Sequence, residues 1–184
     1  EPPSMFSQPV GRVVEVLGEI DDPGMEIEIA VRKFEVPHRF APETIAQAAA
    51  LPEKLRPADL KHRVDLTDVP LVTIDGEDAR DFDDAVYCEP MPSAGKGKTK
   101  KPAGWRLLVA IADVSHYVRT GEPLDEDAYE RATSVYFPRR VIPMLPEKLS
   151  NGLCSLNPDV DRLCMVCDMV VAPNGEIEAY QFYP

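Results

Sequence analysis

The sequence predicts an α+β fold, in which flanking helices accompany a mixed β-sheet and a separate β-hairpin precedes the sheet. Three observations predict it. Of the 184 residues, 44% are hydrophobic and 28% are charged, a balance typical of globular proteins. Apolar runs of strand length recur beyond residue 70, and a short Ala-rich segment bounded by prolines has the character of a helix. The length allows one domain, or a partial domain with a small appendage.

The first 36 residues predict the hairpin. Apolar residues alternate with polar ones at 13–17 and again at 25–31, which is the period of a half-buried strand. Between the two runs, Gly18 and the Asp-Asp-Pro-Gly cluster at 21–24 supply turn residues. Because a lone hairpin is only marginally stable in water, we expect it to belong to a larger unit.

Residues 37–68 predict a linker that contains one short helix. Four prolines interrupt this segment, and an Ala-rich piece lies at 43–51. Pro42 suits the first turn of a helix, and Pro52 suits its end.

From residue 69 onward the pattern is that of a compact domain. We expect a helix that begins near Asp125, which is a residue type that caps helices, and ends near Ala132. The Pro-Asn-Gly sequence at 173–175 favours a tight hairpin turn, and the Gly- and Lys-rich tract at 93–101 favours a hairpin tip. The predicted strands lie at 71–74, 85–88, 105–112, 162–172 and 176–183.

Charge and cysteine content exclude several classes of protein. The 20 basic and 32 acidic side chains give a net charge of -12, which argues against a general nucleic-acid coat but does not set the field inside one cleft. No apolar run approaches a membrane span, and the first residues lack the layout of a signal peptide, so we expect no membrane contact and a cytoplasmic location. Cys164 and Cys167 form a CxxC pair, but without a second pair a buried strand is favoured over a zinc site.

One acidic segment stands out as a candidate site. Six carboxylates fall within the ten positions 75–84, directly between two predicted strands. Such crowded like charges stay ionised together only in open water or around a cation. Hard oxygen ligands of this kind suit magnesium or manganese. Two such cations can bind both the attacking water and the leaving oxygen of a phosphoryl displacement, so phosphodiester hydrolysis is the natural candidate reaction.

Three alternatives compete with this interpretation of the acidic segment, and the residues exclude only the second. Acidic runs are usually solvated loops without a ligand. A calcium EF-hand fails on spacing, because Val86 falls where glycine is required and Pro92 falls where glutamate is required. The short Asp-Phe-Asp sequence at 81–83 also resembles the metal-nucleotide signature of some glycosyltransferases.

Longer stretches of the chain are similar to the first part of the catalytic domain of the ribonuclease II family, also called the RNB family. Together they are far more specific than any short motif. They are residues 71–86, 109–117 (VAIADVSHY), 134–146 (SVYFPRRVIPMLP) and 149–165 (LSNGLCSLNPDVDRLCM).

The resemblance extends to the N-terminal region. GRVVEVLG at 11–18, together with 25–36, resembles the end of the OB-type cold-shock domain that precedes the catalytic domain in this family. It implies that residues 1–36 are the C-terminal part of a cold-shock domain, that 37–68 are a linker, and that 69–184 are the N-terminal half of an RNB catalytic domain.

The function that the resemblance implies is that of a magnesium-dependent, processive 3′-to-5′ hydrolytic exoribonuclease, with manganese as the alternative metal. It would take the 3′ end of single-stranded RNA, not DNA, and release nucleoside 5′-monophosphates. By the same resemblance, Asp75, Asp81, Asp83 and Asp84 would hold the metal, with Asp83 as the catalytic aspartate. Tyr136 would stack on the terminal base, whereas a tyrosine in the core is the structural alternative.

The matched portion is shorter than the catalytic domain of this family. The resemblance places a catalytic arginine and a basic S1 domain outside that portion. We therefore expect the chain alone to be inactive and to self-associate through apolar surface that lacks its natural cover. The competing hypothesis is a non-catalytic fragment that binds RNA or another protein.

Overall fold

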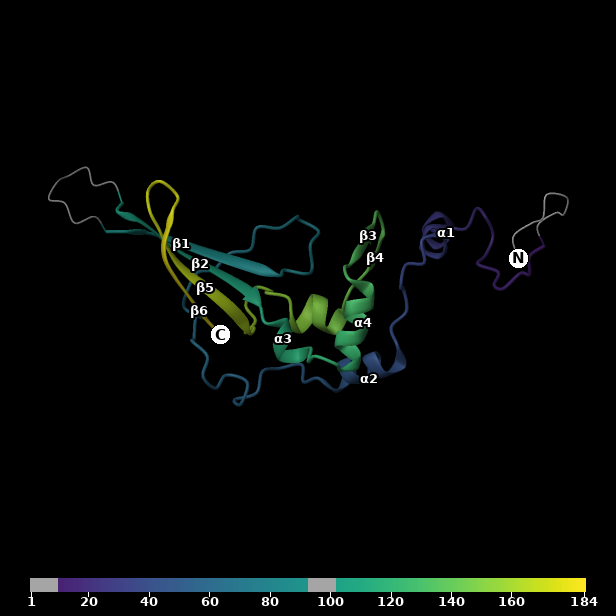
Figure 1. Ribbon diagram of the computed structural model, residues 1–184, viewed down its shortest axis with the longest axis horizontal. Coiled ribbons are helices and arrows are strands. Elements are labelled where there is room, and N and C mark those ends of the chain that lie inside the picture. Colours follow the sequence, from purple (N-terminus) through teal and green to yellow (C-terminus); the bar gives the residue numbers. More distant parts are fainter. Residues whose placement is uncertain (1–9, 93–101) are drawn as a thin grey trace.

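A four-stranded β-sheet and a helical layer make up most of the fold (Figure 1). The computed structural model describes residues 10–92 and 102–184, so the hairpin tip expected at 93–101 lies outside the described residues. In Figure 1 the sheet lies on one side, most of the helices lie beyond one end of it, and the helix nearest the N-terminus lies farthest from it. The predicted α+β class is confirmed.

The sheet has the strand order β1-β2-β5-β6, and every neighbouring pair is antiparallel, so it is not the mixed sheet that the sequence suggested. Its strands confirm the positions predicted beyond residue 84, and the turn at 173–175 joins the last two. At the start of β2, Gly104 approaches Val171 so closely that a Cβ atom would lie 2.5 Å from its carbonyl oxygen. The strands are β1 (Asp84–Met91), β2 (Gly104–Ala112), β5 (Cys164–Val171) and β6 (Ile177–Tyr183).

The helical layer encloses the larger core. Leu124 and Leu149 are fully buried in it, together with the side chain of Tyr117. The helix expected from Asp125 begins two residues earlier, and Asp125 instead accepts a hydrogen bond from the amide of Gly121 at 2.9 Å. The elements are α2 (Pro42–Ala50), which confirms the linker helix, α3 (Val114–Tyr117), α4 (Pro123–Arg131), the π-helix η1 (Lys148–Leu153), and a hairpin of β3 (Val135–Phe137) and β4 (Arg140–Ile142).

The strand pairing predicted for the N-terminal hairpin is wrong. Residues 10–24 form no strand, and the second apolar run is the helix α1 (Met25–Lys33). The run contains good helix formers, with glutamates in the first turn and basic residues in the last, which is the favourable arrangement for the helix dipole. A strand also needs a partner, and within residues 10–92 and 102–184 none lies beside this run, so local helix propensity prevails over the two-residue period.

The strand expected at 71–74 is wrong too. Only Val72 pairs with the sheet, through two backbone hydrogen bonds of 2.9 and 2.8 Å to Val86 at the outer edge of β1. The chain then leaves the edge and exposes Ile74. An apolar run of four residues therefore makes one bridge rather than a strand.

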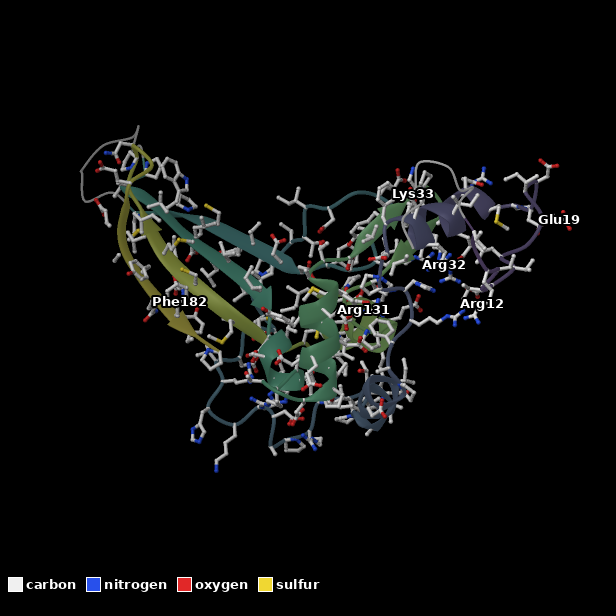
Figure 2. The ribbon with its side chains drawn as sticks, turned by 45° about the vertical axis from the view of Figure 1, so that its right-hand side comes forward. Arg12, Glu19, Arg32, Lys33, Arg131 and Phe182 are labelled. Carbon is white, nitrogen blue, oxygen red and sulfur yellow. The ribbon has the colours of Figure 1, made fainter. Side chains whose placement is uncertain are left out.

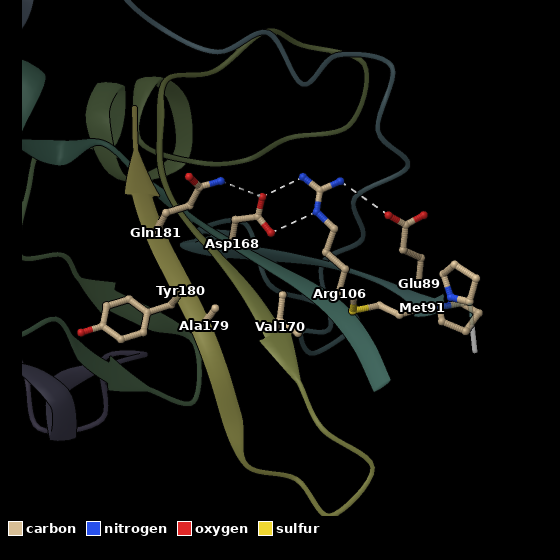
Figure 3. A pocket seen from close by; sticks show the side chains of 10 residues that line it. Glu89, Met91, Arg106, Asp168, Val170, Ala179, Tyr180 and Gln181 are labelled. Carbon is tan, nitrogen blue, oxygen red and sulfur yellow. Dashed lines mark hydrogen bonds and ion pairs between the residues drawn. The ribbon is translucent and has the colours of Figure 1, made fainter. Parts of the chain in front are cut away.

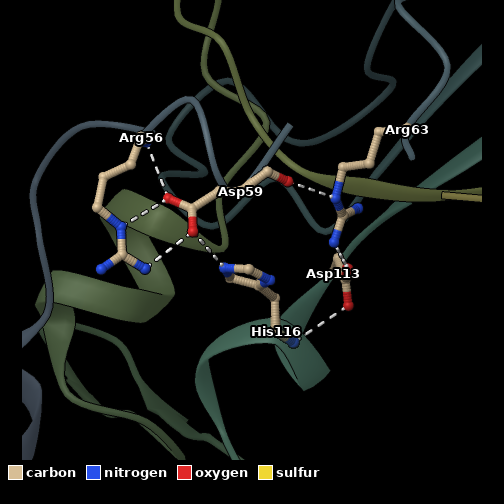
Figure 4. Close-up of polar contacts among 5 residues, drawn as sticks. All are labelled: Arg56, Asp59, Arg63, Asp113 and His116. Atoms are coloured by element: carbon tan, nitrogen blue, oxygen red, sulfur yellow. Dashed lines mark hydrogen bonds and ion pairs between the residues drawn. The ribbon is translucent and has the colours of Figure 1, made fainter. Parts of the chain in front are cut away.

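A buried polar network fastens the linker to α3 (Figure 4). Asp59 accepts hydrogen bonds from the backbone amide and guanidinium of Arg56 and lies 3.4 Å from His116. These hydrogen bonds from Arg56 hold the pKa of Asp59 far below its usual value. Arg63 pairs with Asp113, the residue that directly follows β2. The linker is thus fixed against the end of the central strand.

A second basic side chain joins the start of the linker to α4. Arg131 is buried, donates to the carbonyl oxygen of Pro37 at 2.9 Å, and lies 3.7 Å from the ring centroid of Phe40. Figure 2 shows its position on α4 between the sheet and the N-terminal region. Burial of the guanidinium lowers its pKa.

The two faces of the sheet differ in character. On one face, Leu66 at the end of the linker and Leu71 just after it cover part of the sheet. Farther along this face, Arg106 makes two hydrogen bonds to Asp168 of 3.0 and 2.7 Å (Figure 3). The other face, termed here the apolar sheet face, carries side chains from alternate positions of all four strands. They are Val86, Cys88, Leu107, Val109, Ile111, Met165, Cys167, Met169, Tyr180 and Phe182.

The apolar sheet face is open to solvent. Tyr180 and Phe182 on the edge strand are 68% and 66% exposed, and their rings contact each other with centroids 5.7 Å apart. Figure 2 shows Phe182 on β6, away from the helices. Contiguous apolar surface of this kind marks contact with another protein segment.

We expect the chain to self-associate through this face. Light scattering at micromolar concentration should give a mass above the 20.4 kDa of one chain, and the double change Tyr180→Ser with Phe182→Ser should lower it. Tyr129→Ser is the control, because Tyr129 is 88% exposed on α4 rather than on the sheet. A monomer at all concentrations would contradict the prediction.

Candidate active site

The acidic segment forms a loop, termed here the aspartate loop, at residues 75–84. It begins after the single bridge at Val72 and ends where Asp84 enters β1. Asp75, Asp83 and Asp84 are exposed and Asp81 is half-buried. The four predicted site aspartates thus sit on one loop at the outer edge of the sheet.

Backbone hydrogen bonds fasten the second half of this loop. The amide of Phe82 donates to the hydroxyl of Ser155 at 3.0 Å, and its carbonyl oxygen accepts from the amide of Leu156 at 2.8 Å. The carbonyl oxygen of Asp83 accepts from the amide of Ala112 in β2 at 2.9 Å. The loop is therefore held by the central strand and by the segment that follows η1.

The four aspartates act on one another electrostatically. The pKa of Asp83 is raised, first by loss of water around its carboxyl group and then by the negative charges of Asp81, Asp84 and Asp75. Asp83 therefore lies within the field of the other three, as expected of carboxylates that share one cation site.

Tyr136 reaches the aspartate loop from the β3–β4 hairpin. Its hydroxyl donates a hydrogen bond to Oδ2 of Asp81 at 2.6 Å, and this bond raises the pKa of Tyr136. The side chain is 63% exposed, which excludes the alternative of a core tyrosine. The structure thus brings Tyr136 to the site, 55 residues along the chain from its partner.

The donor chemistry of the loop fits a hard divalent cation, since every candidate ligand is a carboxylate. Within residues 10–92 and 102–184, no three His, Cys, Asp or Glu side chains converge tightly enough to hold a metal by themselves. The metal site of the four aspartates therefore stays a prediction that rests on the chemistry of their carboxylates.

The CxxC pair has the structural role that was predicted. Cys164 and Cys167 lie on β5 and are unpaired thiols. Residues three apart on a strand point to opposite faces of the sheet, so the two sulfurs cannot bind the same ion.

Among the described residues, no helix is both long and apolar enough to cross a bilayer.

Comparison with known proteins agrees with this fold. The RNB domain model matches residues 63–184, and a cold-shock domain model matches residues 1–41. The chain therefore belongs to the RNB domain family. It is 56% identical to ribonuclease R of Escherichia coli over 181 residues, which cover 98% of the chain and 21% of that protein. The chain thus spans about a fifth of the length of ribonuclease R of Escherichia coli and of Vibrio cholerae.

Two solved structures of Mycoplasma genitalium RNase R share the fold. One is a complex with double-stranded RNA, with a TM-score of 0.82, 35% identity, and coverage of 92% of this chain and 28% of that chain. The other is a complex with ribose-methylated single-stranded RNA, with a TM-score of 0.81, 35% identity, and coverage of 92% and 25%. The cold-shock match confirms the predicted family of the N-terminal region, although the hairpin itself is absent from residues 10–36.

Because the pKa of Asp83 is raised, we predict that this aspartate lowers the stability of the native chain at neutral pH. The native carboxyl keeps its proton to a higher pH than the unfolded one, so stability falls as the pH rises from the unfolded to the native pKa, and the loss persists at higher pH. Asp83→Asn should therefore raise the Tm at pH 7. The gain should shrink as the pH approaches about 4, near the pKa of an unfolded aspartate.

Asp78→Asn provides the matched control. It removes the same charge from the same loop, but Asp78 is not among the carboxylates that raise the pKa of Asp83. Thermal unfolding followed by circular dichroism between pH 4 and 8 compares the two variants with the parent chain. An unchanged or lowered Tm for Asp83→Asn at pH 7 would refute the prediction.

Proposed function

We propose that the longer protein represented by this chain is an exoribonuclease and that the chain contributes the metal-binding part of its active site. The observation that carries the proposal is the juxtaposition of four aspartates and an exposed tyrosine within an RNB domain. The proposed reaction is hydrolysis of RNA from the 3′ end in the 3′-to-5′ direction, processively, with release of nucleoside 5′-monophosphates. We place it in the cytoplasm.

The aspartate loop would hold magnesium, or manganese in its place. Asp75 and Asp84 are the proposed direct ligands, and Asp81 is a ligand or supports one. When bound, the metal would neutralise charge on the phosphate and activate a water. Asp83 is the aspartate on which we expect turnover to depend most; loss of water around its carboxyl group, together with the neighbouring carboxylates, raises its pKa.

Tyr136 would bind the terminal nucleotide. Its ring is exposed, and stacking of a base on such a ring contributes about 1–3 kcal/mol. In the structure its hydroxyl is engaged by Asp81, so the ring lies next to the carboxylates that would face the scissile phosphate. Binding and chemistry would thus be adjacent.

RNA is the proposed partner because two RNase R structures that share this fold are complexes with RNA. We propose that the single-stranded 3′ end is the form that enters the site. The net charge of -12 fits the family resemblance, which places the basic S1 domain outside the matched portion.

The second candidate function is non-catalytic binding of RNA or a protein by the chain itself. The open apolar sheet face favours it, because exposed apolar side chains such as Tyr180 and Phe182 offer contact surface. The two functions differ in what they require of the aspartate loop: only the first depends on Asp83 and on a metal.

Metal binding gives a direct test. Titration calorimetry of the chain with manganese should show weak binding that disappears in Asp84→Asn, since a direct ligand is lost. Asp78→Asn should bind as the parent chain does, although it carries the same change in charge. Equal binding by Asp84→Asn and the parent chain would rule out the proposed site.

The activity assay uses a single-stranded oligoribonucleotide with magnesium and measures 5′-monophosphate release. Asp83→Asn should abolish turnover by the full-length protein. The 184-residue chain alone should be slower by at least about 100- to 1,000-fold, because charge on the phosphate also needs cationic groups that the family resemblance places outside the matched portion.

In the same assay Tyr136→Ala should weaken RNA binding by about 5- to 100-fold, the equivalent of one lost stacking contact. Asp78→Asn should leave turnover of the full-length protein unchanged. Comparable turnover by the chain alone and by the full-length protein would show that the remaining portion is dispensable. RNA binding that survives with no turnover in any protein would favour the non-catalytic function.

A further inference from the structure

We propose that Ser155 is a positioning residue for the aspartate loop: its hydroxyl bonds the backbone on both sides of Asp81 and so sets where the metal-binding carboxylates lie. This inference rests on the proposed function of the loop. Ser155 is far from the loop in sequence and was not identified as a site residue from the sequence.

The hydroxyl of Ser155 makes two hydrogen bonds to the loop in opposite senses. It accepts from the amide of Phe82 at 3.0 Å and donates to the carbonyl oxygen of Arg80 at 3.0 Å. Its alternative acceptor, Oδ1 of Asn157, is farther away at 3.5 Å. One oxygen atom therefore spans the two peptide groups that flank Asp81.

The adjacent residue strengthens this contact. The amide of Leu156 donates to the carbonyl oxygen of Phe82 at 2.8 Å, so both backbone groups of Phe82 are bonded to consecutive residues of the same segment. Phe82 separates Asp81 from Asp83. A shift of the Phe82 backbone would thus displace Asp81 and Asp83 together.

The environment of Ser155 suits a positioning role. Its exposed fraction is 0%, so water cannot replace a lost hydrogen bond, and the loop groups would be left without a partner. The guanidinium of Arg162 holds the segment in turn, since its Nε donates to the carbonyl oxygens of Ser155 at 3.0 Å and Gly152 at 2.8 Å. The hydroxyl is therefore presented from a fixed backbone.

The aspartates cannot supply this order themselves. Their charges repel, and the pKa of Asp83 is raised in part for that reason. Within the described residues, Asp81 accepts one side-chain hydrogen bond, from the exposed Tyr136. RNA that stacked on Tyr136 would compete with this bond. Ser155 is buried and would retain its contacts when RNA binds.

The test measures local order and metal binding in the 184-residue chain. Amide hydrogen exchange followed by NMR should show Phe82 exchanging about 10- to 100-fold faster in Ser155→Ala, with the central amides of β2 unchanged. Manganese affinity should fall in the same variant by about 5-fold or more. Ser155→Cys, which keeps a weak donor and acceptor, should lie between Ser155→Ala and the parent chain in both measurements.

Ser150→Ala is the control, because Ser150 lies in η1 and its hydroxyl bonds only Asn151 at 3.3 Å among the described residues. Unchanged exchange at Phe82 in Ser155→Ala, or faster exchange throughout the sheet, would overturn the positioning role. Faster exchange at Phe82 with unaltered manganese affinity would also overturn it. A parent chain that binds no manganese would instead contradict the proposed function, while exchange at Phe82 would still decide whether Ser155 holds the loop.

Discussion

Electrostatic repulsion within the aspartate loop is the constraint on which the rest of the arrangement depends. Carboxylates that must lie together to receive a cation push one another apart when it is absent, so their own contacts cannot hold them. The order comes from neutral polar groups: the backbone amides of Ala112 and Leu156 and the side-chain hydroxyl of Ser155. Ala112 ends the central strand, and the linker is fixed beside that end through Arg63 and Asp113. The sheet and the linker network thus both help to hold the peptide groups of the aspartate loop in place.

Much of the sheet could be predicted because its strands carry their signal locally. The run at 105–112 and the turn at 173–175 are strand and hairpin patterns in themselves, and the structure has both. The run at 25–31 has the same two-residue period, but it has no pairing partner in the part of the chain that the structure describes, and it forms a helix. Local pattern therefore predicts a strand correctly only where the fold supplies a neighbour for it, and this is a property of distant residues.

The candidate site divides in the same way. The aspartates lie close together in the sequence, so the acidic segment could be recognised without knowledge of the fold. Tyr136 was found only through resemblance, because nothing near it in sequence points to Asp81. Ser155 had no signal beyond its place in a family-like stretch, since an isolated serine becomes informative only when its two partners, 75 and 73 residues away, are known.

The residue before Ser155 adds a consequence for redox chemistry. Cys154 is 3% exposed, and burial, together with the negative charges of Asp113 and Asp83, raises its pKa to about 12. The reactive form of cysteine is the thiolate, which oxidants and alkylating agents attack. Cys154 therefore stays a protonated, unreactive thiol at physiological pH, and the exposed Cys88 on β1 is open to such reagents instead. Oxidants would thus modify Cys88 on the outer strand of the sheet and leave Cys154, next to the segment that holds the aspartate loop, unmodified.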